Sequence, residues 1–479
     1  MPSIVALVIS MLLTLAPMNA FAQSATAILD AVGKAMGAPV TSIQYTGKGG
    51  VYAAGQSAVP GLPWPEFNLK SYTRSVNYDT SSVRDEQVRT QALDPPRGGG
   101  LQPIRGEQRL TLLASADLAW NIVGEQPVPV PVTLAERQFQ LWATPHGVLR
   151  AARANNATVQ GRTIVFAVPN RFMLRATVGD DNLISKVDGV IPNPVVGDLP
   201  VEITYSEYRN FGGVMFPTRI REKTGGFPSL DLMVSEVRAN AAVDIQAPDA
   251  VRQAANPYAR VTTQKVGDGI WFLTGGTHNS VVIEMKDYVM VVEAPLNEER
   301  TVAVLAETRK LVPNKRIQYV INSHHHYDHS GGLRAVAAEG ITIVTHEVNK
   351  AFFEQALAAS ATVRPDLQAK APRTPIVEGV RGRLSLTEGD RTVDVYHIAS
   401  NLHHDGLLMV YLPKERLLIE ADAYTPIAAD ATPPMPPSPF TVNLADNITR
   451  LNLAVGDIAP LHGRIVPLAE LNRTIGKSP

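Results

Sequence analysis

The chain has no cysteine among its 479 residues. Disulfide bonds are therefore excluded, so packing alone must hold the fold together. Thiolate metal ligands are excluded by the same absence. Any metal site must be built from imidazole nitrogen and carboxylate oxygen.

An excess of charge of one sign is also absent. Lys and Arg number 44, Asp and Glu number 45, and the formal net charge is −1, with no run of like charge. This balance argues against binding to nucleic acid or to an anionic membrane. With 45% hydrophobic and 19% charged residues, the composition is that of a globular protein. The sequence gives no indication of an oligomeric state.

The sequence lacks an apolar run long enough to span a bilayer with ease. Residues 4–15 form a short apolar stretch, which is followed by Ala20-Phe21-Ala22. This arrangement is typical of a secretory signal peptide, so we predict cleavage after Ala22 and a secreted or periplasmic protein. The stretch is short for spanning a bilayer, and no stable membrane insertion is expected after cleavage.

Two folded domains are expected, because 479 residues exceed one ordinary core. Residues 23–248 contain short alternating stretches separated by Gly and Pro, which predict a mainly antiparallel β domain with a hairpin around Gly212-Gly213. Residues 249–261 are polar and predict a linker. Residues 262–479 alternate strands with helices, one of them at residues 297–312, and predict an α/β sandwich.

Residues 324–329, His-His-His-Tyr-Asp-His, place four histidines and one carboxylate in six positions. They follow an apolar run, residues 319–321, that predicts a buried strand. Side chains alternate along a strand, so His324 and His326 are expected on one side and His325 on the other. Asp328 and His329 would follow at the strand end, where Gly331-Gly332 lets the chain turn into a helix. Two imidazoles on one side form half of a metal site.

The spacing His-x-His-x-Asp-His resembles the signature of the metallo-β-lactamase superfamily. Three later stretches resemble the other motifs of that family in the same order: Leu402-His403-His404-Asp405-Gly406, Leu417-Leu418-Ile419-Glu420-Ala421-Asp422 and Pro460-Leu461-His462-Gly463. The resemblance extends over residues 262–479. It implies a four-layer αβ/βα sandwich for this domain.

The resemblance also implies a ligand set for two divalent metal ions. One metal would be held by His324, His326 and His403, the other by Asp328, His329 and His462, and Asp422 would bridge them. His404 stays an alternative to His403. Zinc is the first expectation, and iron or manganese suit the same donors. The absence of cysteine excludes those relatives whose second site uses a thiolate.

By the same resemblance we expect an exported dinuclear hydrolase that acts on a small molecule. A metal-bridged hydroxide would attack a carboxylic ester, lactone or amide bond. Asp328 is the expected catalytic residue, because its free oxygen can orient that hydroxide. Two alternatives stay open: a β-lactamase, and an iron-dependent sulfur dioxygenase of the same fold that would use only the His324, His326 and Asp422 side.

Two loops carry candidates for substrate contact. His278 lies in a glycine-containing loop that in this fold would overhang the metals. Tyr424 follows Asp422 by two positions, whereas lactonases of the superfamily place a tyrosine three positions after that aspartate. Residues 432–440 contain five prolines in nine positions. They favour polyproline II geometry and predict either a rigid surface connection or a wall of the substrate pocket.

Overall fold

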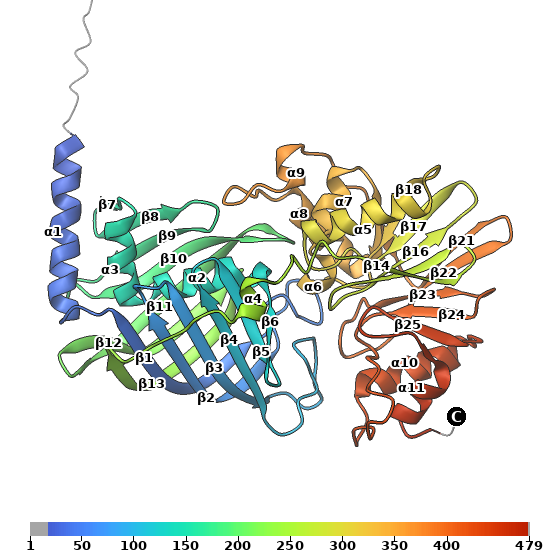
Figure 1. The fold of residues 1–479 in the computed structure, drawn as a ribbon, viewed down its shortest axis with the longest axis horizontal. Helices are drawn as coiled ribbons and strands as arrows, with labels where there is room; N and C mark the ends of the chain where they lie inside the picture. Colours follow the sequence, from blue (N-terminus) through green and yellow to red (C-terminus); the bar gives the residue numbers. More distant parts are fainter. Residues whose placement is uncertain (1–17, 478–479) are drawn as a thin grey trace, which may run out of the picture.

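The computed structural model describes residues 18–477, which form three β-sheets and the helices that cover them (Figure 1). Most of the predicted signal peptide, residues 1–22, falls on positions 1–17 and lies outside the described residues. Within residues 18–477, no helix combines the length and the apolarity needed to cross a membrane.

Thirteen strands form the sheet of the N-terminal half, in the order β6-β5-β4-β3-β2-β1-β13-β12-β11-β10-β9-β8-β7. Two meanders are joined by the antiparallel pairing of β1 with β13, and the predicted mainly antiparallel β domain is confirmed. The strands are β1 Ser42–Tyr52, β2 Glu66–Asn77, β3 Ser82–Gln91, β4 Gln108–Ser115, β5 Leu118–Val123, β6 Gln126–Pro129, β7 Thr158–Gln160, β8 Thr163–Val168, β9 Phe172–Val178, β10 Ile184–Asn193, β11 Gly197–Phe211, β12 Val214–Thr224 and β13 Phe227–Ala239.

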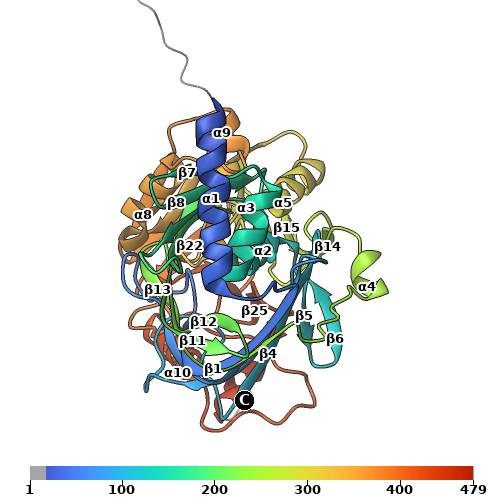
Figure 2. The ribbon, with the colours of Figure 1, turned by 90° about the vertical axis from the view of Figure 1, so that its left-hand side faces the viewer.

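Helices cover one face of this curved sheet (Figure 2). They are α1 Met18–Met36, α2 Leu134–Ala143 and α3 Pro145–Ala154, with a short 3-10 turn at Pro131–Thr133 before α2. Strand β9 shows why the sheet has two unlike faces: Phe172, Leu174, Ala176 and Val178 alternate with more exposed residues and face the helices. Phe139 of α2 meets Phe172 edge-on, with ring centroids 5.7 Å apart. The core of the N-terminal half lies between this face and the helices.

The hairpin predicted around Gly212-Gly213 is the turn between β11 and β12. Phe211 pairs with Val214, and both glycines have positive φ, 64° and 93°. Two successive positive φ values define a type I′ turn, which only residues such as glycine adopt without strain. The sequence therefore located this turn for the correct physical reason.

The segment predicted as a linker, residues 249–261, contains the short helix α4 (Asp249–Arg252). Val251 is buried in a cluster with Trp120 and Ile245, against strands β4 and β5. Residues 252–256 are exposed. The chain therefore packs on the first sheet at Val251, before the second sheet begins at β14. Proteolytic cleavage between two independent domains at this segment stays a prediction.

Two sheets form the C-terminal half. The seven-stranded sheet has the order β14-β15-β16-β17-β18-β19-β20, and the six-stranded sheet has the order β21-β22-β23-β24-β25-β26. The strands are β14 Thr262–Gly267, β15 Ile270–Thr274, β16 Ser280–Glu284, β17 Tyr288–Val292, β18 Arg316–Ile321, β19 Thr342–His346, β20 Val377–Val380, β21 Arg383–Glu388, β22 Arg391–His397, β23 Leu408–Leu412, β24 Leu417–Glu420, β25 Asp457–Pro460 and β26 Val466–Pro467. The helices are α5 Glu298–Leu311, α6 Tyr327–Ser330, α7 Leu333–Ala338, α8 Glu347–Ala358, α9 Leu367–Lys370, α10 Pro439–Arg450 and α11 Leu468–Thr474.

Three hydrophobic clusters divide this half into four layers. One cluster lies between the two sheets, one lies between the seven-stranded sheet and α5, α7 and α8, and one lies between the six-stranded sheet and α10 and α11. Strands β17 and β23 are buried at every position because both faces of their sheets are covered. The four-layer αβ/βα sandwich is confirmed, and so is the helix predicted at residues 297–312, whose first turn is capped by the Asn297 side chain accepting from the Arg300 N–H at 2.9 Å.

The parallel strand pairs decide where a site can form. Strand β17 runs parallel to β18 in one sheet, and β24 runs parallel to β25 in the other. The loops after these four strands therefore emerge at carboxyl ends, where ligands of α/β sheets commonly bind. They carry Glu293, the motif at 324–329, Asp422 and His462, respectively.

Candidate metal centre

The histidine motif lies in the loop after β18 and in the helical turn that follows. Strand β18 ends at Ile321, so His324, His325 and His326 are beyond the strand on which they were predicted. His326 is nevertheless extended, with φ −54° and ψ 144°. The predicted alternation is also present, because His324 and His326 lie in one cluster and His325 contacts His404 and Ser57 instead. Asp328 and His329 belong to the single turn α6.

Gly331 and Gly332 were predicted to let the chain turn into a helix, but the structure shows that they allow close packing instead. Neither has a positive φ, so they are not required by a turn. A Cβ atom on Gly331 would come within 2.0 Å of the Leu296 carbonyl oxygen, and one on Gly332 within 1.6 Å of the Thr301 hydroxyl. Glycine is needed here because α6 and α7 approach the start of α5 closely.

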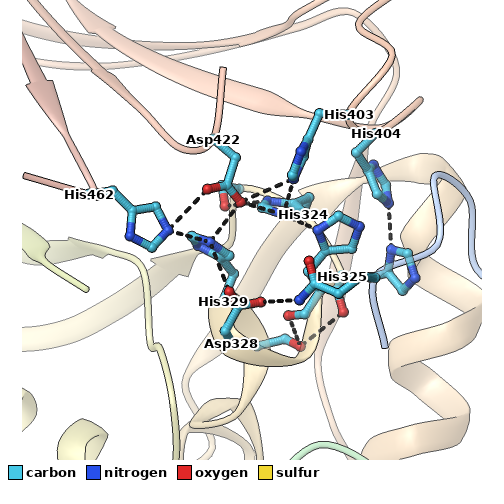
Figure 3. A network of polar contacts seen from close by, with 12 residues as sticks. His324, His325, Asp328, His329, His403, His404, Asp422 and His462 are labelled. Carbon is cyan, nitrogen blue, oxygen red and sulfur yellow. Dashed lines mark hydrogen bonds and ion pairs between the residues drawn. The ribbon is translucent and has the colours of Figure 1, made fainter. Parts of the chain in front are cut away.

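The first cluster of donor atoms contains His324, His326, His403 and Asp422. Figure 3 labels His324, His403 and Asp422 of this cluster. The distance from His324 Nε2 is 2.9 Å to His326 Nδ1, 3.3 Å to His403 Nε2 and 3.2 Å to Asp422 Oδ2. A tetrahedral zinc ion with bonds of about 2.0–2.1 Å places its ligand atoms about 3.3 Å apart. The spacing of these donors suits one such ion.

The second cluster contains His278, Asp328, His329 and His462. His462 Nε2 lies 3.0 Å from His329 Nε2, and His278 Nε2 lies 3.3 Å from Asp328 Oδ2. The structure thus brings together the three side chains predicted for the second metal, with His278 as a fourth. His278 is only 6% exposed, so it lies beside these donors rather than at the surface where a substrate would first arrive.

Asp422 lies between the two clusters. Its Oδ2 atom is 3.2 Å from His324 Nε2 and 2.9 Å from His329 Nε2, while Oδ1 is 3.0 Å from His462 Nε2. The Ala423 N–H donates to the Ala421 carbonyl at 2.7 Å and encloses Asp422, whose φ is +60°, in a γ-turn. A strained backbone of this kind persists where the surrounding structure requires it, and here it directs one carboxylate at both clusters.

Four of the imidazoles are oriented by a protein oxygen on the side away from the clusters. His324 Nδ1 donates to Ser323 Oγ at 2.9 Å, His329 Nδ1 to Glu293 Oε2 at 3.0 Å, and His462 Nδ1 to the Thr277 carbonyl at 3.1 Å. His326 Nε2 donates to the Ser57 carbonyl at 2.9 Å. In the neutral imidazole, each donation leaves the other ring nitrogen with a free lone pair. Metal-binding histidines show this arrangement, in which the second nitrogen fixes the tautomer.

Glu293 was missed by the sequence analysis. This fully buried carboxylate follows β17, accepts from His329 Nδ1, and accepts from Ser323 Oγ at 2.5 Å and Asn322 Nδ2 at 3.1 Å. It therefore orients His329 directly and His324 through Ser323. The only trace in the sequence is a single acidic residue that ends an apolar strand, which has no family spacing to distinguish it.

Burial and close neighbours shift the pKa values of the histidines and aspartates in the two clusters. Burial lowers the pKa of His324 and His326 well below the ordinary histidine value, and their imidazole neighbours lower it further. Burial also lowers the pKa of His329, but the Asp422 and Asp328 carboxylates outweigh it and raise that pKa well above the ordinary value. Both carboxylates have pKa values well below their ordinary range despite burial, because His329 lies beside them. These anions would favour a divalent cation in the same place.

His325 and His404 lie outside both clusters. His325 Nδ1 is 2.5 Å from His404 Nε2, and His325 Nε2 is 3.2 Å from Ser57 Oγ. His404 Nδ1 accepts from the Gly406 N–H at 2.8 Å. The structure therefore brings His403, and not the alternative His404, to the first cluster.

Tyr424 was predicted as a possible substrate contact, but the structure places it in the hydrophobic core. Its ring is 1% exposed and packs in the cluster between the six-stranded sheet and α10 and α11. Its N–H donates to Glu420 Oε2 at 3.1 Å. The γ-turn at Asp422 reverses the chain, so the side chain two positions later packs in the core and not beside the two clusters of donor atoms.

The proline-rich segment, residues 432–440, leads into α10. Its last residue, Phe440, packs edge-on against His403 with ring centroids 5.4 Å apart, and the Pro436 carbonyl accepts from Arg105 of the N-terminal half. One end of the segment thus lies beside the first cluster, and its middle contacts a loop of the other half.

Comparison with known proteins agrees with this geometry. Residues 273–459 match the model of the metallo-beta-lactamase superfamily. The C-terminal half belongs to this superfamily. The chain is also similar to the 2,4-dinitroanisole O-demethylase subunit alpha of Nocardioides sp. (strain JS1661), with 25% identity over 162 residues, which is 34% of this chain and 46% of that protein. The match thus spans less than half the length of that relative.

Solved metallo-β-lactamases are similar to a part of the chain. The metallo-beta-lactamase from Pontibacter korlensis has 18% identity and a TM-score of 0.35, with 45% of this chain and 98% of that chain covered. The DIM-1 metallo-beta-lactamase has 16% identity and a TM-score of 0.35, with coverage of 45% and 95%.

Proposed function

We propose that the C-terminal half is a dinuclear metal-dependent hydrolase that cleaves a carboxylic ester, lactone or amide bond of a small molecule. The observation that carries the proposal is the orientation of the imidazoles. Four of them donate one ring nitrogen to a protein oxygen and direct the other at the donors of the two clusters. Two bound dications would supply a hydroxide nucleophile at neutral pH and a Lewis acid for the scissile carbonyl.

The protein residues have separate tasks in this proposal. His324, His326 and His403 would hold one ion, and Asp328, His329 and His462 the other, with Asp422 shared. Asp328 lies at the more open edge, with its side chain 36% exposed, so a substrate can approach it. Its carboxylate is the group that would orient the attacking hydroxide. His278 donates to Asp328 and supports that orientation.

The second cluster argues against the sulfur dioxygenase alternative. An iron dioxygenase would need only the His324, His326 and Asp422 side, whereas the structure also has a second cluster in which His329 and His462 are oriented by protein oxygens. This observation supports two metals. The dinitroanisole O-demethylase relative adds an activated aryl methyl ether as a further bond to examine, and β-lactam cleavage stays an alternative.

A substrate screen of the zinc-loaded full-length protein tests the proposal. The panel comprises chromogenic esters, lactones, an anilide, a phosphodiester, a cephalosporin and 2,4-dinitroanisole. We expect turnover of an ester, lactone or amide that is lost on chelation and restored by zinc. Turnover of the phosphodiester or the aryl ether alone, or turnover that survives chelation, would contradict the proposal.

We also propose that the protein is exported. The apolar N-terminal stretch and the Ala20-Phe21-Ala22 pattern support the proposal. N-terminal sequencing of protein recovered from a bacterial periplasmic fraction should begin at Gln23. Protein that stays in the cytosol with Met1 intact would contradict it.

A further inference from the structure

The loop of residues 53–58, between β1 and β2 of the N-terminal sheet, lies directly on the metal centre. The Ser57 carbonyl accepts from His326 Nε2 at 2.9 Å. The Gly55 carbonyl accepts from the Tyr327 N–H at 3.3 Å, and the Ala58 carbonyl from the Asp405 N–H at 2.9 Å. The loop thus contacts the chain on both sides of the first cluster, beside the 324–329 motif and beside His403.

A second loop of the N-terminal half holds the first in place. The Gly98 N–H donates to the Leu402 carbonyl and the Gly99 N–H to the Gln56 carbonyl, both at 2.9 Å. Arg97 pairs with Asp405 at 2.9 Å. A Cβ atom on Gly99 would lie 3.0 Å from His326 Cε1 and 1.9 Å from Gln56 Oε1. Glycine at this position therefore lets the backbone lie against both side chains.

Gln56 is the side chain through which the N-terminal half reaches a carboxylate of the centre. Its Nε2 donates to Asp328 Oδ1 at 2.8 Å. Its Oε1 accepts from the Gly100 N–H at 3.2 Å. Because a backbone N–H can only donate, Gly100 fixes which end of the amide is oxygen and turns the NH2 group toward Asp328.

The two oxygens of Asp328 are divided by these contacts. Oδ1 faces Gln56, whereas Oδ2 lies 3.3 Å from His278 Nε2 and 3.9 Å from His329 Nε2. Without the amide donor, the plane of the Asp328 carboxylate could turn about its terminal bond and carry Oδ2 away from His278 and His329. The amide keeps Oδ2 within the second cluster of donors.

We infer that Gln56 is a positioning residue of the metal centre, by which the N-terminal half fixes the Asp328 carboxylate for the second metal. The inference rests on the proposed dinuclear function. It gives the N-terminal half a defined part in the site, because the loop of residues 53–58 orients His326 through a carbonyl and Asp328 through an amide. Hydrogen bonds that orient metal ligands typically change metal affinity or activity about 10- to 100-fold when removed.

Zinc titration of full-length apoprotein against a chromophoric chelator tests the inference. Gln56→Met keeps the length of the side chain and removes the donor, and Gln56→Asn stays polar but is one carbon too short to reach Asp328. The matched control is Gln44→Met. Gln44 is a half-buried glutamine of β1 whose amide donates to Ser75 Oγ at 2.9 Å, away from the centre. Dissociation constants for both zinc equivalents are measured for each protein, with kcat on the best substrate of the screen.

Both Gln56 variants should bind the second zinc about 10- to 100-fold more weakly, bind the first as the wild type does, and lose kcat more than they change KM. Gln44→Met should match the wild type. If the wild type binds two zinc ions and the Gln56 variants bind the second as tightly or more tightly, the inference is wrong while the proposed function stands. If the wild type itself binds fewer than two, both fail.

Discussion

The two halves of the protein bury polar side chains in different ways. In the N-terminal half, Arg74 and Asp85 lie directly opposite each other on β2 and β3. In the C-terminal half, buried imidazoles face one another. Arg74 binds both carboxylate oxygens of Asp85, at 2.7 and 2.6 Å, so donor meets acceptor and the pair is complete. In the metal centre, His324 Nε2 and His326 Nδ1 are 2.9 Å apart although each ring donates its other nitrogen elsewhere. Two free lone pairs then face each other.

The difference separates a structural polar cluster from a functional one. Buried polar groups are normally paired within the protein, as Arg74 and Asp85 are. A group of ligand atoms that converge on one another is suited to a bound cation. Burial alone does not mark the site, since both pairs are buried; the orientation of the lone pairs does.

Removing one partner of the Arg74–Asp85 pair should give the largest effect on stability. Asp85→Ala leaves a buried guanidinium without its carboxylate, which should cost about 3–5 kcal/mol of unfolding free energy. Denaturant unfolding measures it, with Asp188→Ala as control, because Asp188 pairs with Lys186 on the surface with 41% of its side chain exposed. That control should change stability by less than about 1 kcal/mol. Equal effects of the two variants would contradict the structural role of the buried pair.

His146, in α3 of the N-terminal half, should make stability depend on pH. Burial lowers its pKa from 6.5 to about 4, so between these values the unfolded chain binds a proton that the folded chain does not. Stability is therefore full above pH 6.5, falls as pH drops toward 4, and flattens below it, by about 3 kcal/mol in all. Unfolding of the wild type and His146→Phe across this range measures the contribution as the difference between their slopes. Parallel curves would refute it.

Asp328→Asn should lower kcat about a hundredfold, because the amide keeps the size of the side chain but loses the charge that orients the nucleophile. The fold should be unaffected, since Asp328 is half-buried at the edge of the sandwich. Steady-state kinetics of the zinc-loaded protein and a thermal melt check both parts. A variant with wild-type kcat would show that Asp328 has no part in turnover.

His325→Ala should have the smallest effect, less than about tenfold on kcat, as expected for a residue beside a site and not in it. His325 contacts His404 and Ser57 Oγ rather than the donors. The variant tests the alternation of side chains along residues 324–326. A folded His325→Ala protein that binds no zinc would mean that the ligand assignment is wrong.

The resemblance of four motifs to one family predicted the layers of the C-terminal half and seven of the eight residues in the two clusters, whereas His278 was predicted as a substrate contact. The prediction failed where the geometry is not local. Glu293 reaches His329 across 36 positions and Gln56 reaches Asp328 across 272, and single Glu or Gln residues carry no spacing. The prediction for Tyr424 was wrong because the γ-turn at Asp422 reverses the chain. No sequence pattern predicts a positive φ at an aspartate.

The metal content of the full-length protein tests the central claim most directly. Protein purified without chelator, with zinc in the growth medium, is dialysed and analysed by elemental mass spectrometry against protein concentration. The two clusters of oriented donors predict about two equivalents of divalent transition metal per chain, falling to about one in Asp328→Ala. A wild-type value near zero after zinc supplementation would contradict the account.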